Sequence, residues 1–181
     1  MSTKLKLANL GENNIKVTSV DEEEHNKSII TTLYEAFNNY NNIDQSVHLL
    51  FAPYLEWWFH GPPSHQHHLK RLLTGSSSPS HLSFPFVPLS VAAFESMVIV
   101  EGYDDERSVA WVHAWTLADG IITHVREYYN TSVTVTRLGN SQSLSSSSSE
   151  STVHSANKNC QSVWQSKLCD ESAVPGLVLA L

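Results

Sequence analysis

The chain has 181 residues, 41% of them hydrophobic, so it can bury one globular core with tails but is short for two full domains. Its formal net charge is −7, and its 11 Lys and Arg residues are scattered, which disfavours a nucleic-acid-binding protein. No segment approaches the roughly 18 apolar residues of a membrane span, and no signal peptide stands near the start. We therefore expect a cytoplasmic protein, also able to be nuclear, without membrane contact.

The first secure element is a helix near the start of the chain. Residues 1–18 are polar and keep no hydrophobic period, which predicts a flexible lead-in. Ser19 then opens a Ser-Val-Asp-Glu capping box, which satisfies backbone amides at a helix start. Apolar residues follow with the helical period and predict a helix over 20–39: Ile29, Ile30, Leu33 and Phe37.

Two shorter helices and one strand are predicted next. Weaker patterns predict helices over 43–51 and 64–74, and Pro53 ends the first because the residue before a proline avoids helical geometry. Between them, the aromatic run 54–61 predicts a strand. Period-two alternation places four of its side chains on one face: Tyr54, Glu56, Trp58 and His60.

The pattern then changes to strands. Strands are predicted over 84–91 and 94–101. The strongest hairpin signal is Asp119-Gly120, between 109–117 and 121–138. A two-residue loop pairs Leu117 with Ile122, Trp115 with His124, His113 with Arg126, and Trp111 with Tyr128.

This register sorts the hairpin into a small apolar face and a large face that is both aromatic and polar. Aromatic walls with a few polar groups are typical of small-ligand pockets, although an exposed or dimer-forming face has a similar composition. The predicted ligand-binding residues come from this face and from the strand 54–61: Trp58, His60, Trp111, His113, Trp115, Arg126, Tyr128 and Asn130.

The end of the chain has two parts of opposite composition. Residues 139–160 are rich in Ser and Asn, with little to bury, which predicts a disordered tether after a domain over 19–138. Residues 161–181 are apolar again and close on Val-Pro-Gly-Leu-Val-Leu-Ala-Leu. Since a free apolar end promotes aggregation, we expect this segment to dock on the domain or on a partner.

Four runs of the chain resemble the plant family of wound-induced protein 1 and its senescence-associated relatives. They are Leu-Glu-Trp-Trp-Phe-His-Gly-Pro-Pro at 55–63, His-Leu-Lys-Arg-Leu-Leu-Thr-Gly at 68–75, Val-Trp-Gln-Ser-Lys at 163–167 and the closing 174–180. The resemblance implies a plant stress-response protein with a SnoaL-like domain of the nuclear-transport-factor-2-like superfamily. The implied α+β fold is a cone of three N-terminal helices on a curved antiparallel sheet.

Enzymes of the wider superfamily often end the last strand of the sheet with an Asp that faces the pocket. The matching stretch here ends in Asn130, and an amide cannot act as a general acid or base. Period two places Glu127 on the opposite face, so it is not expected to replace that carboxylate. The remaining catalytic candidates are His60 and His113, with Glu56 beside His60.

Neither a metal nor a cofactor is expected. The spacing of His65 and His68 brings them together on a helix, but the adjacent His67 and His68 are expected to point apart, and no Cys or Asp joins them. The chain also lacks a phosphate-binding Gly-Lys-Ser/Thr loop and a Gly-x-Ser-x-Gly elbow.

Three functions stay open from the sequence. The first is a stress-response protein that binds a small, largely apolar ligand in the cone without strong catalysis. The second is an isomerase, cyclase or hydrolase that uses a pocket histidine. The third is an interaction module that recruits a partner through the C-terminal peptide. A homodimer is expected as well, because many proteins with this fold pair through the sheet.

Overall fold

The computed structural model describes residues 11–38, 45–74, 84–138, 160–168 and 174–181. The chain divides into two compact units, Met1–Tyr129 and Asn130–Leu181. No helix within the described ranges is both long and apolar enough to cross a membrane. The predicted tether over 139–160 lies outside these ranges except for its last residue.

The first unit contains two helices of more than one turn among its described residues. Helix α1 spans Gly11–Asn38 and therefore begins before the predicted start at Ser19, so part of the predicted lead-in is helical. Helix α3 spans His67–Thr74 and follows a 3-10 turn at Pro63–His65. Helix α2, Gln45–His48, is a single turn in place of the helix predicted over 43–51.

The prediction of a cone with three N-terminal helices is therefore wrong. The second helix is cut short because the following residues pair with a distant strand: the amide of Ile122 donates to the carbonyl of Leu50, and Phe51 pairs with Ile122. Long-range strand pairing thus overrides a weak local helix preference. The third helix, α3, follows the first strand, as the sequence predicts.

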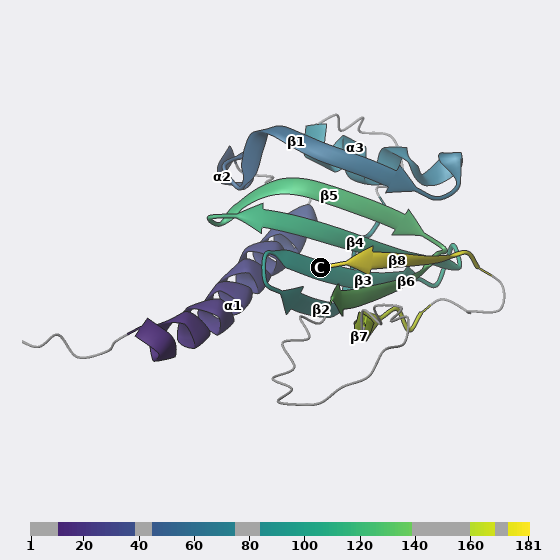
Figure 1. Ribbon diagram of the computed structural model, residues 1–181. Coiled ribbons are helices and arrows are strands. Elements are labelled where there is room, and N and C mark those ends of the chain that lie inside the picture. Colours follow the sequence, from purple (N-terminus) through teal and green to yellow (C-terminus); the bar gives the residue numbers. More distant parts are fainter. Residues whose placement is uncertain (1–10, 39–44, 75–83, 139–159, 169–173) are drawn as a thin grey trace, which may run out of the picture. The chain divides into compact units, whose positions relative to one another are not determined.

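A five-stranded sheet forms the body of the first unit (Figure 1). Its strand order is β1-β5-β4-β3-β2, which leaves β1 and β2 at opposite edges. The strands are β1 Phe51–His60, β2 Pro88–Phe94, β3 Met97–Asp104, β4 Val109–Ala118 and β5 Ile121–Tyr129.

The sheet is mixed and not antiparallel throughout as predicted. Strands β2 to β5 form an antiparallel meander, but β1 pairs with β5 in parallel. The reason is the path of the chain: after β1 it crosses through α3 to the far edge, and the meander returns with β5 running in the same direction as β1.

Two tight turns shape the meander. The Asp119-Gly120 turn is where the sequence predicts it, and its φ values of 51° and 75° are those of a twisted hairpin turn. A second turn at Glu95-Ser96, with Glu95 at φ 54°, separates β2 from β3 inside the segment 94–101 that the sequence predicts as one strand, so the start of that predicted strand is wrong.

The register of the β4–β5 hairpin shifts by one residue near its turn. Leu117 pairs with Ile122 as predicted, but Thr116 pairs with His124, so Thr123 has no cross-strand partner. The Thr123 hydroxyl donates to the Thr116 carbonyl at 3.2 Å within this bulge. Beyond it, His113 pairs with Glu127 and not with Arg126.

The strand predicted over 121–138 is two strands in different sheets. It breaks after Tyr129, where Asn130 has a φ of 46°, a left-handed conformation that Asn tolerates better than most residues. The second sheet has the order β7-β6-β8, with β6 Ser132–Leu138, β7 Cys160–Gln165 and β8 Gly176–Ala180.

The apolar C-terminal segment pairs with the chain's own β6. Strand β8 runs parallel to β6, with Val135 beside Leu179. Backbone hydrogen bonds from Ser132 to Pro175 and from Leu181 to Thr136 hold its two ends. Of the expected alternatives, the structure thus shows the segment docked within the chain.

The core of the first unit lies between α1 and one face of the five-stranded sheet. Ile30, Leu33 and Phe37 of α1 are buried there with aromatic residues of β4. Polar contacts attach α1 to the β2–β3 turn: Asn26 Nδ2 donates to the Glu95 carbonyl at 3.2 Å, and the Glu95 amide donates to Glu23 Oε1 at 2.8 Å. We call the α1 side of the sheet the inner face and the opposite side the outer face.

The Trp111 indole packs against Gly102 on β3. The two residues are cross-strand partners. A Cβ atom at position 102 would overlap the Trp111 ring and lie 2.7 Å from the carbonyl oxygen of Val87. The absence of a side chain therefore lets the indole lie against the backbone of β3.

We expect Gly102→Ala to lower the free energy of unfolding by about 1–3 kcal/mol, because a buried ring and a strand must move to admit one methyl group. Urea unfolding of both proteins measures the change. The matched control is Gly176→Ala, whose Cβ would meet no atom within 4 Å and which should change stability by less than about 0.5 kcal/mol. Equal effects at the two positions would contradict the assigned packing.

Candidate functional site

Two hydrogen-bonded groups of three side chains each meet on the inner face, where His113 of one lies 3.4 Å from Glu127 of the other, and we call the six together the polar core. Four elements contribute: α1, β1, β4 and β5. The members are Tyr34, Trp57, His113, Trp115, Glu127 and Tyr129. His113 and Glu127 are completely buried, which makes the network the most polar part of an otherwise aromatic interior.

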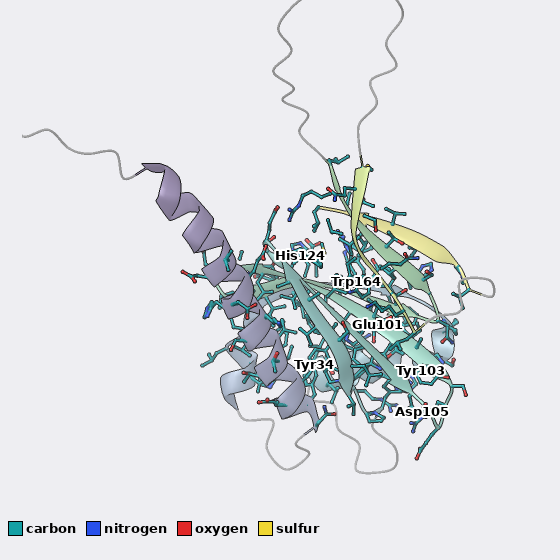
Figure 2. All side chains as sticks on the ribbon, turned by 90° about the horizontal axis from the view of Figure 1, so that it is seen from below. Tyr34, Glu101, Tyr103, Asp105, His124 and Trp164 are labelled. Atoms are coloured by element: carbon teal, nitrogen blue, oxygen red, sulfur yellow. The ribbon has the colours of Figure 1, made fainter. Side chains whose placement is uncertain are left out.

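Tyr34 joins helix α1 to strand β4 (Figure 2). Its hydroxyl oxygen accepts a hydrogen bond from Trp115 Nε1 at 3.0 Å, and the hydroxyl lies 2.6 Å from His113 Nδ1. We assign the Tyr34 proton to this contact, which makes His113 Nδ1 the acceptor and places the ring proton of His113 on Nε2.

Glu127 accepts two hydrogen bonds and lies close to a third nitrogen atom. Trp57 Nε1 donates to Oε2 at 3.1 Å, and the Tyr129 hydroxyl donates to Oε1 at 3.0 Å. His113 Nε2 lies 3.4 Å from Oε1, which is ion-pair range without hydrogen-bond geometry. A buried carboxyl group needs such donors, because its desolvation is otherwise costly.

The two tyrosines of the polar core are held in their protonated form. Burial raises the pKa of Tyr34 well above its usual value; the Trp115 hydrogen bond opposes this, and the charge of Glu127 adds to it. Burial also raises the pKa of Tyr129, and the charge of Glu127 raises it further. Both hydroxyl groups consequently act as hydrogen-bond donors at neutral pH.

Two buried nitrogen atoms near this network have no hydrogen-bond partner among the described residues. They are Trp111 Nε1 and His113 Nε2. Trp111 and His113 are neighbours on the inner face of β4, with ring centroids 4.9 Å apart. A buried donor without a partner is unfavourable, so both N–H groups call for an acceptor that the described side chains do not supply.

The predicted site residues lie on both faces of the sheet. Trp111, His113 and Trp115 are on the inner face, fully buried. The cross-strand pairs predicted for them on β5, Tyr128, Arg126 and His124, are wrong, because the bulge at Thr123 moves β5 by one residue. Their partners are Tyr129, Glu127 and Val125.

Most other predicted residues lie on the outer face. Trp58 is 63% exposed and is beside Arg126 in the β1–β5 pairing, while His60 is beside Tyr128. Glu56, expected beside His60, forms an exposed ion pair with His124 at 3.4 Å. Asn130 follows β5, beyond the last pair with β4. Whether these residues bind a ligand stays a prediction.

The sequence reasoning missed Tyr34, Trp57, Glu127 and Tyr129 as site residues. Glu127 was assigned to the opposite face from His113, which is wrong, since the two are direct cross-strand partners. A signal was present for Trp57, because alternation along the strand already separated it from Trp58. No local sequence pattern predicts the bulge that brings Glu127 to the inner face.

Three histidines meet at the start of α3. His65 Nδ1 lies 3.3 Å from His68 Nε2, and the ring of His67 lies 4.3 Å from that of His68, so the expectation that these two point apart is wrong. Burial, followed by the charge of His67, lowers the pKa of His68 to about 4. Burial likewise lowers the pKa of His65.

Sequence comparisons connect the chain to plant proteins. The family model for wound-induced protein WI12 matches residues 70–181. The protein "Senescence associated gene 20" of Arabidopsis thaliana is 52% identical over 113 residues, which cover 61% of this chain and 99% of the relative. "Wound-induced protein 1" of Solanum tuberosum is 50% identical over 113 residues, with the same two shares.

Solved structures with a similar fold come from bacteria. An NTF2-like protein from Burkholderia xenovorans is 23% identical, with a TM-score of 0.42, over 59% of this chain and 90% of that chain. A putative SnoaL-like polyketide cyclase from Jannaschia sp. is 18% identical, with a TM-score of 0.41, over 60% and 87%. These likenesses concern the fold alone.

Removing one oxygen atom tests the polar core. Tyr34→Phe leaves Trp115 Nε1 and His113 Nδ1 without their partner, so we expect the free energy of unfolding to fall by about 1–3 kcal/mol. Tyr54→Phe removes the same atom from a side chain that is 91% exposed and should change stability by less than about 0.5 kcal/mol. Urea unfolding that finds no difference between the variants would show that the network is not formed.

The lowered pKa of His68 predicts a measurable pH dependence. NMR titration of the His68 ring should give a midpoint near pH 4, below the ordinary histidine value of about 6.5. As the pH falls, the unfolded chain protonates His68 at about pH 6.5, whereas the folded chain does so only at about pH 4. The free energy of unfolding therefore decreases as the pH falls from about 6.5 to about 4. His68→Gln should remove that part of the pH dependence of urea unfolding. A midpoint at the ordinary value would contradict the assigned burial.

Proposed function

Because the chain belongs to the wound-induced protein WI12 family, we propose that it is a plant wound- and senescence-response protein that binds a small, largely apolar ligand on the inner face of its five-stranded sheet. The observation that carries this proposal is that two buried nitrogens, Trp111 Nε1 and His113 Nε2, have no hydrogen-bond partner in the part of the chain that the structure describes. A ligand oxygen that accepts from them would remove an energetic cost of the protein alone.

The surroundings of the two donors suggest the chemistry of the ligand. Aromatic rings dominate: Phe86 lies edge-on to Trp111 at 5.2 Å, and Tyr34 stacks on Trp111 at 5.8 Å. A flat or ring-shaped apolar body suits such walls. The Glu127 carboxyl group lies 3.4 Å from His113 Nε2 and disfavours a second anion there, so a neutral carbonyl or ether oxygen fits best.

An enzyme of isomerase, cyclase or hydrolase type is the second candidate. One observation favours it: His113 lies between a tyrosine hydroxyl at Nδ1 and a carboxyl group near Nε2. A histidine oriented in this way can accept or donate a proton on a bound molecule. Of the two histidines predicted as catalytic, His113 fits this role, whereas His60 is exposed on the outer face.

The remaining expectations have less support. An adaptor that recruits a partner through its C-terminal peptide needs that peptide to be free, but β8 is paired with β6. The homodimer and the cytoplasmic or nuclear location stay predictions. Within the described residues, Trp58 and Tyr54 on the edge strand β1 are exposed aromatic side chains that a partner could contact.

Native mass spectrometry of the full chain purified from wounded plant tissue tests ligand binding. The wild-type protein should carry an added small mass, which Trp111→Phe should lose or retain weakly, because this change removes one N–H donor and keeps an aromatic ring. The matched control is Trp58→Phe on the outer face, which should retain the mass. A wild-type protein without any added mass, or loss only in the control, would contradict the proposal.

The same preparation separates binding from catalysis. The protein with its bound molecule is incubated in heavy water, and the released molecule is analysed for deuterium on carbon. Exchange that occurs with wild-type protein and stops in His113→Gln supports proton transfer by His113. A bound molecule that does not exchange indicates a binding protein.

A further inference from the structure

Two histidines and an arginine from three segments of the chain meet near the start of α3. His65 ends the 3-10 turn Pro63–His65, and His68 is the second residue of α3. Arg107 comes from the turn between β3 and β4, and its guanidinium carbon lies 5.6 Å from the centroid of the Phe84 ring. The ring of His68 lies 4.7 Å from the same phenylalanine. The arginine and the histidine therefore pack against one aromatic ring.

The charged groups around His68 have the same sign. Burial is the first cause of its lowered pKa, and the charges that add to it are those of His67 and Arg71 on its own helix and of His65 and Arg107 on neighbouring segments. Each of these groups opposes a proton on His68, because like charges repel. A negative group placed among them would be attracted by all of them.

The acidic residues of the β3–β4 turn leave Arg107 able to bind an anion. Asp104 is buried, and its two oxygen atoms accept from Arg107 Nη1 and from the Arg107 backbone amide. A guanidinium group has five N–H donors, so one such bond does not exhaust it. Asp105 and Glu106 are exposed, where water and salt screen their charge.

The second histidine is held beside a buried acid. His65 is stacked on Tyr129, with ring centroids 5.0 Å apart and an interplanar angle of 16°. Burial and the charge of His67 lower the pKa of His65, while the charge of Glu127 opposes them. Glu127 is completely buried and already accepts two hydrogen bonds. It therefore leaves the partly exposed side of the cluster without neutralising it.

We propose that His65, His68 and Arg107 form a binding site for the oxyanion group of a small molecule, a carboxylate or a phosphate. The planar guanidinium fork matches the oxygen atoms of either group. All three side chains are partly exposed, so a small anion can reach them from solvent. The site is distinct from the buried nitrogens Trp111 Nε1 and His113 Nε2 of the proposed ligand site, and the proposal does not rest on them.

Binding of the anion is coupled to a proton on the histidine pair. His65 Nδ1 and His68 Nε2 are 3.3 Å apart, so one neutral ring donates to the other. A neutral imidazole has one N–H donor and a protonated imidazole has two. A proton taken up by His68 thus adds both a donor and a positive charge that the oxyanion stabilises.

An NMR titration of the full chain with sodium sulfate tests this coupling. Sulfate keeps both of its charges over the pH range used, and sodium chloride is exchanged for it at constant ionic strength. The midpoint of His68 should rise from about 4 toward the ordinary histidine value of about 6.5. Because binding takes up a proton, sulfate should bind several-fold more tightly at about pH 5 than at about pH 7.

Two variants and a matched control locate the site. His68→Gln and Arg107→Gln should each weaken sulfate binding at about pH 5 by about fivefold or more, since hydrogen bonds to a charged group are stronger than those between neutral groups. Lys27→Gln removes one positive charge from an exposed position on α1 and should bind sulfate as the wild type does. A variant that does not fold leaves the decision to the titration of the wild-type protein.

A parallel titration with sodium benzoate at about pH 6 separates the two sources of the oxyanion. Tighter binding of benzoate assigns the site to a carboxylate, and tighter binding of sulfate assigns it to a phosphate or sulfate group. A His68 midpoint that neither anion changes, or equal weakening in Lys27→Gln, would overturn the proposal. Trp111 and His113 do not enter this test, so the ligand site on the inner face and the oxyanion site can each fail without the other.

Discussion

The unpaired Thr123 between β4 and β5 is the constraint on which the interior of the first unit depends. One extra residue in β5 moves every later pair by one position, so Glu127 faces the same side as His113. A hairpin without this bulge would bring Arg126 to the inner face and turn Glu127 outward. The long side chain of Arg126 is instead exposed, and the carboxyl group of Glu127 is completely buried.

The burial of Glu127 and His113 then determines how the surrounding elements join. A buried carboxyl group and a buried imidazole need partners, and these are Tyr34 from α1 for His113, and Trp57 from β1 and Tyr129 from β5 for Glu127. This network ties α1 and the edge strand to the meander, yet His113 Nε2 within it and Trp111 Nε1 beside it have no hydrogen-bond partner among the described residues. The polar core therefore serves both the packing of the first unit and, through His113, the proposed binding of a ligand.

This arrangement changes the argument about catalysis. Asn130 in place of a carboxylate counted against an enzyme, and it lies beyond the paired part of β5. The carboxyl group on the inner face belongs to Glu127, and it lies close to His113, which the sequence predicts as a candidate proton carrier. On the outer face the predicted residues Trp58, His60 and Arg126 are exposed, whereas Tyr128 is buried.

The sequence by itself determined what short-range physics controls: the apolar stripe of α1, the Asp119-Gly120 turn, the aromatic strand around Pro53, the common face of Trp111, His113 and Trp115, and the motifs that mark the family. The tertiary structure alone decided the parallel pairing of β1, the bulge at Thr123 and the partners of His113. These depend on contacts between residues far apart in the chain, such as Tyr34 with His113 and Trp57 with Glu127. Period-two alternation is a local rule, and a single inserted residue reverses its outcome without leaving a mark in composition or hydrophobicity.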